Sequence, residues 1–286
     1  YSTANLKNHK WLDIVPKRHP IADLAAAMDQ LNQDPQTAGR IHHFLLPSKT
    51  WGSAADAKDL KSFAADQQKL LKNWRNSIRR SPTTVQTKTL SMLGYRVEIL
   101  WQSALQRLRI AEEQSRRTIT LWGADHTTST PVVKRTQIEE ELFANPDSPY
   151  NRLRLVMDAW CALSFWPVTE AANAPLFDAW LAALQDILGM HSKAFINKQT
   201  LASVTDWNDL TDVEVQDLQF AGALPIAECL EKHEWFKTVK EIAAEQGFFH
   251  WELDFAAVFA KGGFDLQIGN PPWVRPRSDV DALLAE

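Results

Sequence analysis

Two long segments of helical apolar spacing limit most strongly what this chain can fold into. Large apolar residues recur every three or four positions between residues 60 and 78, in a stretch without glycine or proline. Ser81-Pro82 interrupts the pattern, and a second apolar stripe then continues to about residue 117. Such spacing puts apolar side chains on one face of an α-helix. We expect helices over about 53–80 and 83–117, joined as an antiparallel hairpin. The side chains expected between them are Leu70, Trp74, Leu93 and Val97.

The rest of the chain shows mostly helical patterns and few signals for strands. Further helices are expected over residues 21–32, 134–144, 151–165, 175–189 and 219–246, the last interrupted at Pro225. The β-branched run 118–122 is typical of a short strand, and polar loops with one short strand or turn are expected over 190–216. Near the end, residues 248–253 look extended, Gly262-Gly263 is typical of a turn, and 264–269 alternate as in a strand. These patterns predict a mainly α fold with a few short strands.

The composition is that of a folded protein in a reducing compartment. Of the 286 residues, 45% are hydrophobic and 23% are charged, which excludes a disordered chain. No apolar run reaches the roughly 18 to 20 residues that a membrane span needs, so no membrane partner is expected. Two cysteines are too few for a disulfide framework, and a cytoplasmic location fits best. Because the chain begins at Tyr1 and not at methionine, we expect an internal fragment of a longer polypeptide.

Charge is distributed unevenly along the chain. Residues 68–135 hold thirteen Lys/Arg against four Asp/Glu, whereas residues 136–286 hold ten against twenty-four. The basic residues of the middle part fall into two clusters, Lys72, Arg75, Arg79 and Arg80, then Arg107, Arg109, Arg116 and Arg117. Contact with phosphate groups and solvated helix ends both explain these clusters, and the sequence does not choose between them.

One short motif, Asn270-Pro271-Pro272-Trp273, directly follows the strand predicted over 264–269. The exocyclic amino group of adenine is a poor nucleophile because its lone pair is conjugated with the ring. A site that methylates this group has to accept hydrogen bonds from its hydrogens. The side-chain oxygen of Asn270 and the carbonyl of Pro271 are two such acceptors. Consecutive prolines restrict the backbone and hold the acceptors in place. Trp273 offers a flat face on which a flipped base can stack.

The sequence around this motif resembles a known family. The segments FHWELDFAAVF and GGFDLQIGNPPW are similar to the large adenine-specific DNA methyltransferases of restriction-modification and phage-defence systems, in which a strand ends in an Asn-Pro-Pro-aromatic loop. The specific match covers about residues 248–276. The resemblance implies that Asn270 and Pro271 bind the amino group and that Trp273 stacks on the base. It also implies S-adenosylmethionine as methyl donor and DNA as substrate.

The helical patterns and the resemblance together indicate how the chain is divided. We expect an N-terminal segment over 1–52, the helical hairpin over 53–122, a helical cluster over 123–247 and the start of the catalytic region over 248–286. The last region would be the truncated edge of a Rossmann-like methyltransferase domain. The remainder of the parent methyltransferase would then be the partner of this chain.

The chain lacks the glycine loop that such a methyltransferase uses for its cofactor. None of its ten glycines are spaced as Gly-x-Gly, although close backbone approach to a cofactor normally requires that spacing. We therefore expect S-adenosylmethionine to be bound mainly by parts of the parent outside this chain. The fragment alone is expected to be inactive.

Other interpretations stay open at this stage. The motif could be a rigid turn, and related loops also serve RNA and protein-amide methyltransferases. A non-catalytic helical interaction or spacer module is the alternative from another class of protein. The eight histidines lack partners at metal-ligand spacing, so no metal site is expected, and Asp125-His126 is interpreted as a loop pair. Cys161 and Cys229 are interpreted as core residues.

Overall fold

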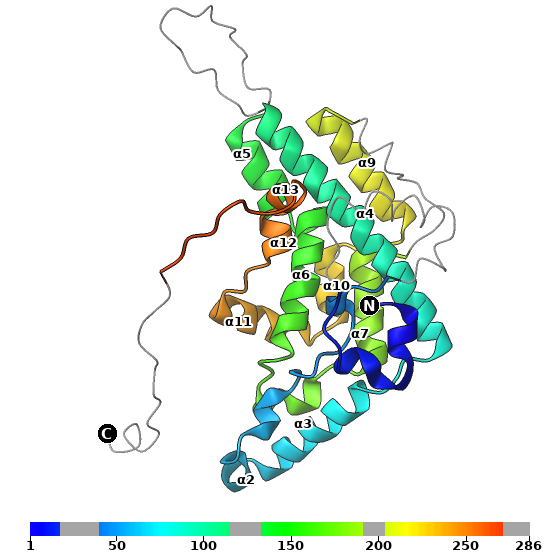
Figure 1. The fold of residues 1–286 in the computed structure, drawn as a ribbon, viewed down its shortest axis with the longest axis vertical. Helices are drawn as coiled ribbons and strands as arrows, with labels where there is room; N and C mark the ends of the chain where they lie inside the picture. Colours follow the sequence, from blue (N-terminus) through cyan, green and yellow to red (C-terminus); the bar gives the residue numbers. More distant parts are fainter. Residues whose placement is uncertain (18–39, 115–132, 191–203, 271–286) are drawn as a thin grey trace, which may run out of the picture.

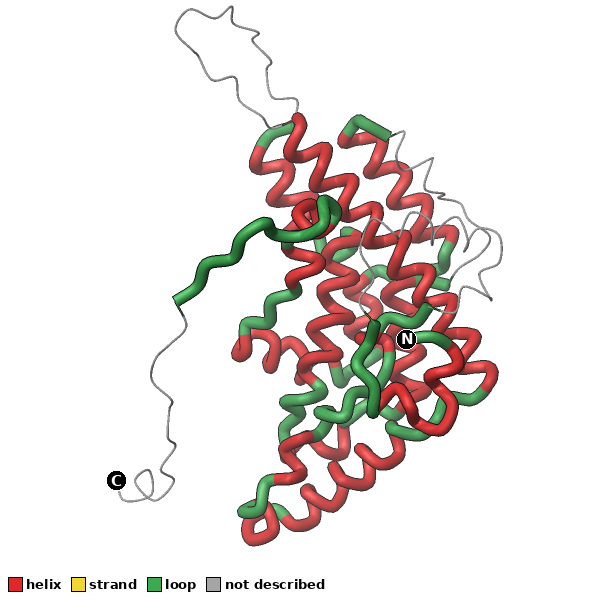
Figure 2. Tube along the Cα trace, viewed as in Figure 1, coloured by secondary structure: helices red, strands yellow, loops and turns green. Residues whose placement is uncertain are grey.

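The computed structural model describes residues 1–17, 40–114, 133–190 and 204–270. Helices take up 68% of these residues, and none of them forms a β-strand, as Figure 2 shows. An isolated antiparallel bridge joins Ser2 to Arg40. The mainly α fold predicted from the sequence is therefore confirmed. The short strands and the Rossmann-like edge are not found among the described residues.

The longer α-helices are α3 (Ala65–Ile78), α4 (Thr84–Gln114), α6 (Pro149–Ala162), α7 (Phe177–Leu188), α9 (Trp207–Phe220) and α11 (Phe236–Gln246). The shorter α-helices are α2 (Leu60–Phe63), α5 (Arg135–Ile138), α10 (Ile226–Lys232), α12 (Trp251–Asp254) and α13 (Ala256–Phe259). Turns of 3-10 helix are η1 (Thr3–Leu12), η2 (His43–Leu45), η3 (Ser53–Asp56) and η5 (Val168–Asn173), and η4 (Glu139–Ala144) is π-helical. The helices predicted over 134–144, 151–165 and 175–189 are confirmed. The helix predicted over 21–32, the strand predicted over 118–122 and the pair Asp125-His126 lie outside the described residues.

Helix α4 is covered by other elements on several sides (Figure 1). It packs most extensively against α6 and α7, and α9 and α13 also contact it. Every residue from Leu93 to Trp101 is buried, so the burial extends around the whole helix, which is typical of a helix inside a core. Gly94 permits a close approach by another segment, because a Cβ atom there would lie 2.3 Å from the carbonyl oxygen of Arg40.

The antiparallel hairpin predicted for 53–80 and 83–117 is wrong, although both segments are helical. Helix α3 packs mainly against η5 and η3, and it diverges from α4 beyond their junction. Leu70, which was expected between the two helices, is 50% exposed. Trp74 is buried, and its indole N–H donates to the carbonyl of Pro175 at 2.8 Å. The physical reason is that α4 is apolar around its circumference and needs several neighbours, whereas α3 has one narrow apolar face.

Tryptophans fill much of the core and also fix the loops to the helices. The indole N–H of Trp51 donates to the carbonyl of Trp160 at 2.9 Å, and that of Trp180 donates to the carbonyl of Leu45 at 3.0 Å. These bonds satisfy polar groups that would be costly to bury unpaired. Trp74, Trp101 and Trp180 are buried in the core, and the half-buried Trp160 packs against it.

Two buried ion pairs join α4 to α9. Both Nη atoms of Arg96 donate to the Asp217 carboxylate, at 2.8 and 2.7 Å. Arg107 donates through Nη2 to Glu214 Oε2 at 2.6 Å, and all four side chains are at most 9% exposed. Burial raises the pKa of Glu214, an effect that Arg107 opposes. The prediction of polar loops is therefore wrong for residues 207–216, where the polar residues of a helix face the arginines of α4.

Candidate functional site

The last described residues leave the helical body as an arm, which comprises residues 264–270 (Figures 1 and 2). These residues have no regular secondary structure, so the strand predicted over 264–269 is not formed. A strand needs a neighbouring strand with which to pair, and none of the described residues supplies one. The extended structure predicted over 248–253 is also wrong in part, because α12 begins at Trp251.

Asn270, the first predicted catalytic residue, is exposed at the end of the arm. Pro271 and Trp273 lie outside the described residues, so their arrangement around Asn270 stays a prediction. Along the arm, Phe264, Leu266 and Ile268 are 43%, 73% and 85% exposed. The alternating apolar side chains that lead to the motif are therefore uncovered.

A group of polar contacts fixes α12, which precedes the arm in the sequence, to α6. This group, the clasp, consists of Tyr150, Arg154 and Asp158 of α6 with His250 and Asp254. His250 Nε2 lies 2.7 Å from Asp158 Oδ1, and Tyr150 Oη donates to Asp254 Oδ1 at 2.5 Å. Burial and the bond to Asp254 raise the pKa of Tyr150 to about 12, so its hydroxyl stays a donor. The clasp therefore holds α12 against α6.

The spacing of the α6 residues is a sequence signal for the clasp. Tyr150, Arg154 and Asp158 are spaced four residues apart, so they share one face of α6. Three polar residues in a row along one face of a helix indicate a polar partner at that face. What the spacing could not reveal is that the partners lie about a hundred residues further along the chain, at His250 and Asp254.

Aromatic rings connect α12 to the start of the arm. The Phe255 ring centroid lies 5.6 Å from that of Trp251 and 5.1 Å from that of Phe264. Between these rings the chain turns at Gly262-Gly263, as predicted, with φ angles of 104° and 109° that side-chain-bearing residues rarely adopt. The aromatic contacts hold Phe264 beside the body, while Leu266 and Ile268 extend beyond it.

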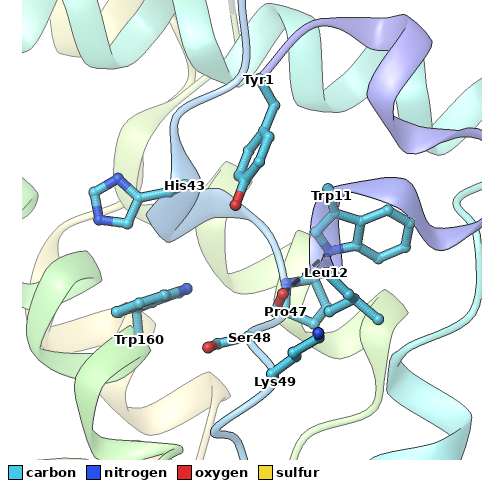
Figure 3. Close-up of a pocket in the computed structure, with 8 residues that line it drawn as sticks. All are labelled: Tyr1, Trp11, Leu12, His43, Pro47, Ser48, Lys49 and Trp160. Atoms are coloured by element: carbon cyan, nitrogen blue, oxygen red, sulfur yellow. Dashed lines mark hydrogen bonds between the residues drawn. The ribbon is translucent and has the colours of Figure 1, made fainter. Parts of the chain in front are cut away.

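A small cavity lies apart from the arm, between η1, η2 and α6 (Figure 3). It is lined by Tyr1, Trp11, Leu12, His43, Pro47, Ser48, Lys49 and Trp160. Its volume is about 100 Å³, less than the roughly 150 Å³ of an engineered cavity that binds benzene. Lys49 is already paired, since its Nζ lies 2.5 Å from Asp13 Oδ1. A nucleoside-sized cofactor does not fit this cavity.

The histidines and cysteines of the described residues do not form a metal or nucleophilic site. No three potential metal ligands lie together in this part of the chain. His42 and His233 each contact one carboxylate, Glu98 at 2.8 Å and Asp186 at 2.6 Å. Burial raises the pKa of both Cys161 and Cys229 to about 11, which keeps them as thiols at neutral pH. The interpretation as a core residue is confirmed for Cys229, which is buried in α10, whereas Cys161 in α6 is only half-buried.

Comparison with known proteins finds similarity between the second half of the chain and a family model. Residues 152–284 match the Eco57I restriction-modification methylase family model. The match supports a restriction-modification methyltransferase. No curated protein and no solved structure matches the chain.

The match to the Eco57I restriction-modification methylase family covers the residues that the sequence singled out. It begins on α6 and extends past the arm, so it contains Asn270, Pro271 and Trp273. It also contains the whole clasp except Tyr150. Helices α3 and α4 lie before it. Among the described helices, none is both long and apolar enough to cross a membrane.

Proposed function

We propose that this chain is part of an S-adenosylmethionine-dependent DNA methyltransferase of a cytoplasmic restriction-modification or phage-defence system. The enzyme would methylate the exocyclic amino group of adenine. One observation carries the proposal: the Asn270-Pro271-Pro272-Trp273 sequence lies within the region that matches the methylase family. The exposure of Asn270 at the end of the arm is consistent with a residue that meets a large substrate.

In this proposal the residues of the motif orient the base. The Asn270 side-chain oxygen and the Pro271 carbonyl accept hydrogen bonds from the amino group, which directs the nitrogen lone pair away from the ring system. Trp273 stacks on the adenine after it has left the duplex. The two prolines limit the torsional freedom of the acceptors, so little orientation entropy is lost when the base binds.

The cavity beside Trp160 does not fit the methyl donor. Sites for small molecules have volumes of roughly 300 to 1,000 Å³, whereas the cavity beside Trp160 measures about 100 Å³. The sequence also has no Gly-x-Gly. We therefore place the donor site mainly in parts of the parent protein outside this chain.

The 286-residue chain by itself is expected not to bind S-adenosylmethionine. The reason is that a donor site needs a glycine loop and an acidic ribose partner on successive strands, and the chain shows no such unit. Isothermal titration calorimetry of the purified chain with S-adenosylmethionine measures this directly, with a full-length methyltransferase as positive control. Micromolar binding would show that the helical body holds a donor pocket, and would contradict this placement.

In the full-length protein, Trp273→Ala is expected to weaken binding of the flipped base by roughly 1–3 kcal/mol, the contribution of one stacked base. Trp273→Phe should keep most of the binding, since it retains an aromatic face. The measurement is methyl transfer to duplex DNA over a range of DNA concentrations, with the modified base identified by mass spectrometry. Methyl groups found on cytosine, RNA or a protein amide, and none on adenine, would refute the proposed substrate.

A second role is favoured for the part of the chain that the family model does not match. Residues 1–151 contain α4, which organises contacts with α6, α7 and α9. We propose that this part is a helical interaction or spacer module that supports the catalytic region. One enzyme can contain both a methyltransferase region and a helical module that supports it.

A further inference from the structure

The structure separates the two basic clusters of the sequence. In the second cluster, Arg107 is buried and paired with Glu214, Arg109 is exposed, and Arg116 and Arg117 lie outside the described residues. The first cluster lies on α3 and just past its end, where Arg75 is paired with Asp56. Among the described residues the first cluster still holds more accessible cations than the second, so it is the candidate for an interaction surface.

Of the two lysines on α3, Lys69 lies opposite the buried face. With 3.6 residues per turn, Lys72 falls between Lys69 and the edge of that face, and Arg79 caps the end of the helix. The buried residues Gln68, Leu71, Trp74 and Ile78 occupy the other side. Lys69 is exposed and Lys72 is half-buried. The exposed Arg80 follows directly after the helix, so the row of positive charges continues past its end.

Helix η1 extends this row. The backbone N–H of His9 donates to Ser81 Oγ at 3.2 Å, and His9 Nδ1 lies 2.6 Å from the carbonyl oxygen of Arg79. These bonds place η1 beside the end of α3. Lys7 and Lys10, on either side of His9 in the sequence, are both exposed.

Nearby carboxylates neutralise only part of this charge. Asp56 is occupied by Arg75, with bonds of 2.6 and 2.8 Å, and Asp13 is occupied by Lys49. Asp66, in the first turn of α3, lies one turn from Lys69 and offsets part of the charge of that lysine only. Arg79 donates through Nη2 to the Lys49 carbonyl, while its buried Nε has no hydrogen-bond partner among the described residues. Burial and repulsion by Arg75 lower the pKa of Arg79, which an added anion would counteract.

We infer that this surface, the α3 face, binds the phosphate backbone of double-stranded DNA. The α3 face consists of Lys7, Lys10, Lys69, Lys72, Arg79 and Arg80. The choice of DNA rests on the proposed function. A row of lysines and arginines contacts phosphates and positions a protein on the duplex without reading its sequence. The face lies before the residues that match the methylase family, so the chain would hold DNA at a second place besides the motif.

The test reverses three charges in the full-length protein, Lys69→Glu, Lys72→Glu and Arg80→Glu. Binding to a duplex of arbitrary sequence is followed by fluorescence anisotropy over a series of salt concentrations. Each lost phosphate contact lowers the slope of log K against log salt by about 0.9, so the slope should fall by roughly 2–3. At low salt the affinity should fall roughly tenfold or more. The milder variant with glutamine at the same three positions should show a smaller change in the same direction, and thermal melting checks that both variants fold.

A matched control variant reverses three exposed lysines elsewhere, Lys237→Glu, Lys240→Glu and Lys261→Glu. The net charge changes equally, so long-range attraction falls equally, but no α3 contact is lost. The inference is overturned if both variants lose the same affinity or if the α3 variants bind like the unmodified protein. Tighter binding to duplex RNA than to DNA of equal length would also overturn it. Binding needs no methyl donor, so the two proposals can fail separately. If the α3 variants methylate adenine and bind DNA like the unmodified protein, the α3 face is refuted and the proposed function is not. If the unmodified protein never methylates adenine and the α3 variants still lose DNA binding, the proposed function is refuted and the α3 face is not.

Discussion

Changing Asn270 to alanine is expected to lower the methylation rate of the full-length protein by roughly 100- to 1,000-fold. The loss of one positioned acceptor should raise the barrier by about 2.7–4 kcal/mol, by analogy with the removal of one oxyanion-hole donor. DNA binding should survive, because the change removes no charge from the phosphate-binding residues. Single-turnover methylation with saturating DNA measures the rate, and anisotropy measures the binding.

The arm offers a matched control for this variant. Gln267 is also exposed, carries the same side-chain amide and lies three residues before Asn270. Gln267→Ala should leave the methylation rate nearly unchanged. If Asn270→Ala methylates as fast as Gln267→Ala, Asn270 is not the acceptor and the catalytic assignment fails.

The largest effect on stability is expected from Asp217→Ala in α9. Arg96 is 2% exposed and would remain as a buried charge, with only its Nε bond to the Leu188 carbonyl. Removing one partner of a buried ion pair costs roughly 3–5 kcal/mol. Urea unfolding of the purified chain, followed by circular dichroism, should therefore show a clearly lower midpoint.

Two further variants separate the buried charge from the loss of a helix residue. Asp212→Ala changes an exposed aspartate of the same helix and should alter the free energy of unfolding by less than about 0.5 kcal/mol. The double variant Arg96→Met with Asp217→Leu replaces the pair by apolar side chains and should recover most of the stability. Equal stability of Asp217→Ala and Asp212→Ala would show that the ion pair contributes little.

The sequence predicted most helices but not how they pack. Apolar spacing located α3, α4, α6 and α7 because helical periodicity is a local property. Which helix covers which face depends on contacts distant in the sequence. The continuous burial from Leu93 to Trp101 shows why a single partner for α4 was the wrong expectation.

Helix α9 was missed because half of its buried face is polar. Trp207 and Leu210 are buried, but so are Glu214 and Asp217, and these two acids interrupt the apolar spacing. A local signal was nevertheless present. Asp206 caps the helix by accepting hydrogen bonds from the backbone N–H groups of Asn208 and Asp209, and an aspartate before a helical segment is a common start signal.

The candidate site was partly predictable. The Asn270 motif could be found because its residue types have a direct chemical reason. The alternation from Phe264 to Ile268 was interpreted as a strand, but alternation describes side-chain directions and does not supply a pairing partner. The spacing on α6 indicated one side of the clasp, but its partners could not be foreseen, because its bonds join α6 to residues about a hundred positions away.

A small rotation at the Gly262-Gly263 turn would move the end of the arm over a long distance. No atom outside the neighbouring residues lies within 4 Å of the Cβ position at either glycine, so the ring contacts of Phe264 with Phe255 and Phe259 fix the chain just after the turn. Seven residues separate Gly263 from Asn270, and an extended chain of that length reaches about 23 Å. A rotation of roughly 20° at the turn would then displace Asn270 by about 8 Å, whereas an error of about 1 Å can cost a reaction 100-fold in rate. The clasp fixes α12, which precedes the arm, and contacts along Leu266 and Ile268 have to determine the position of Asn270.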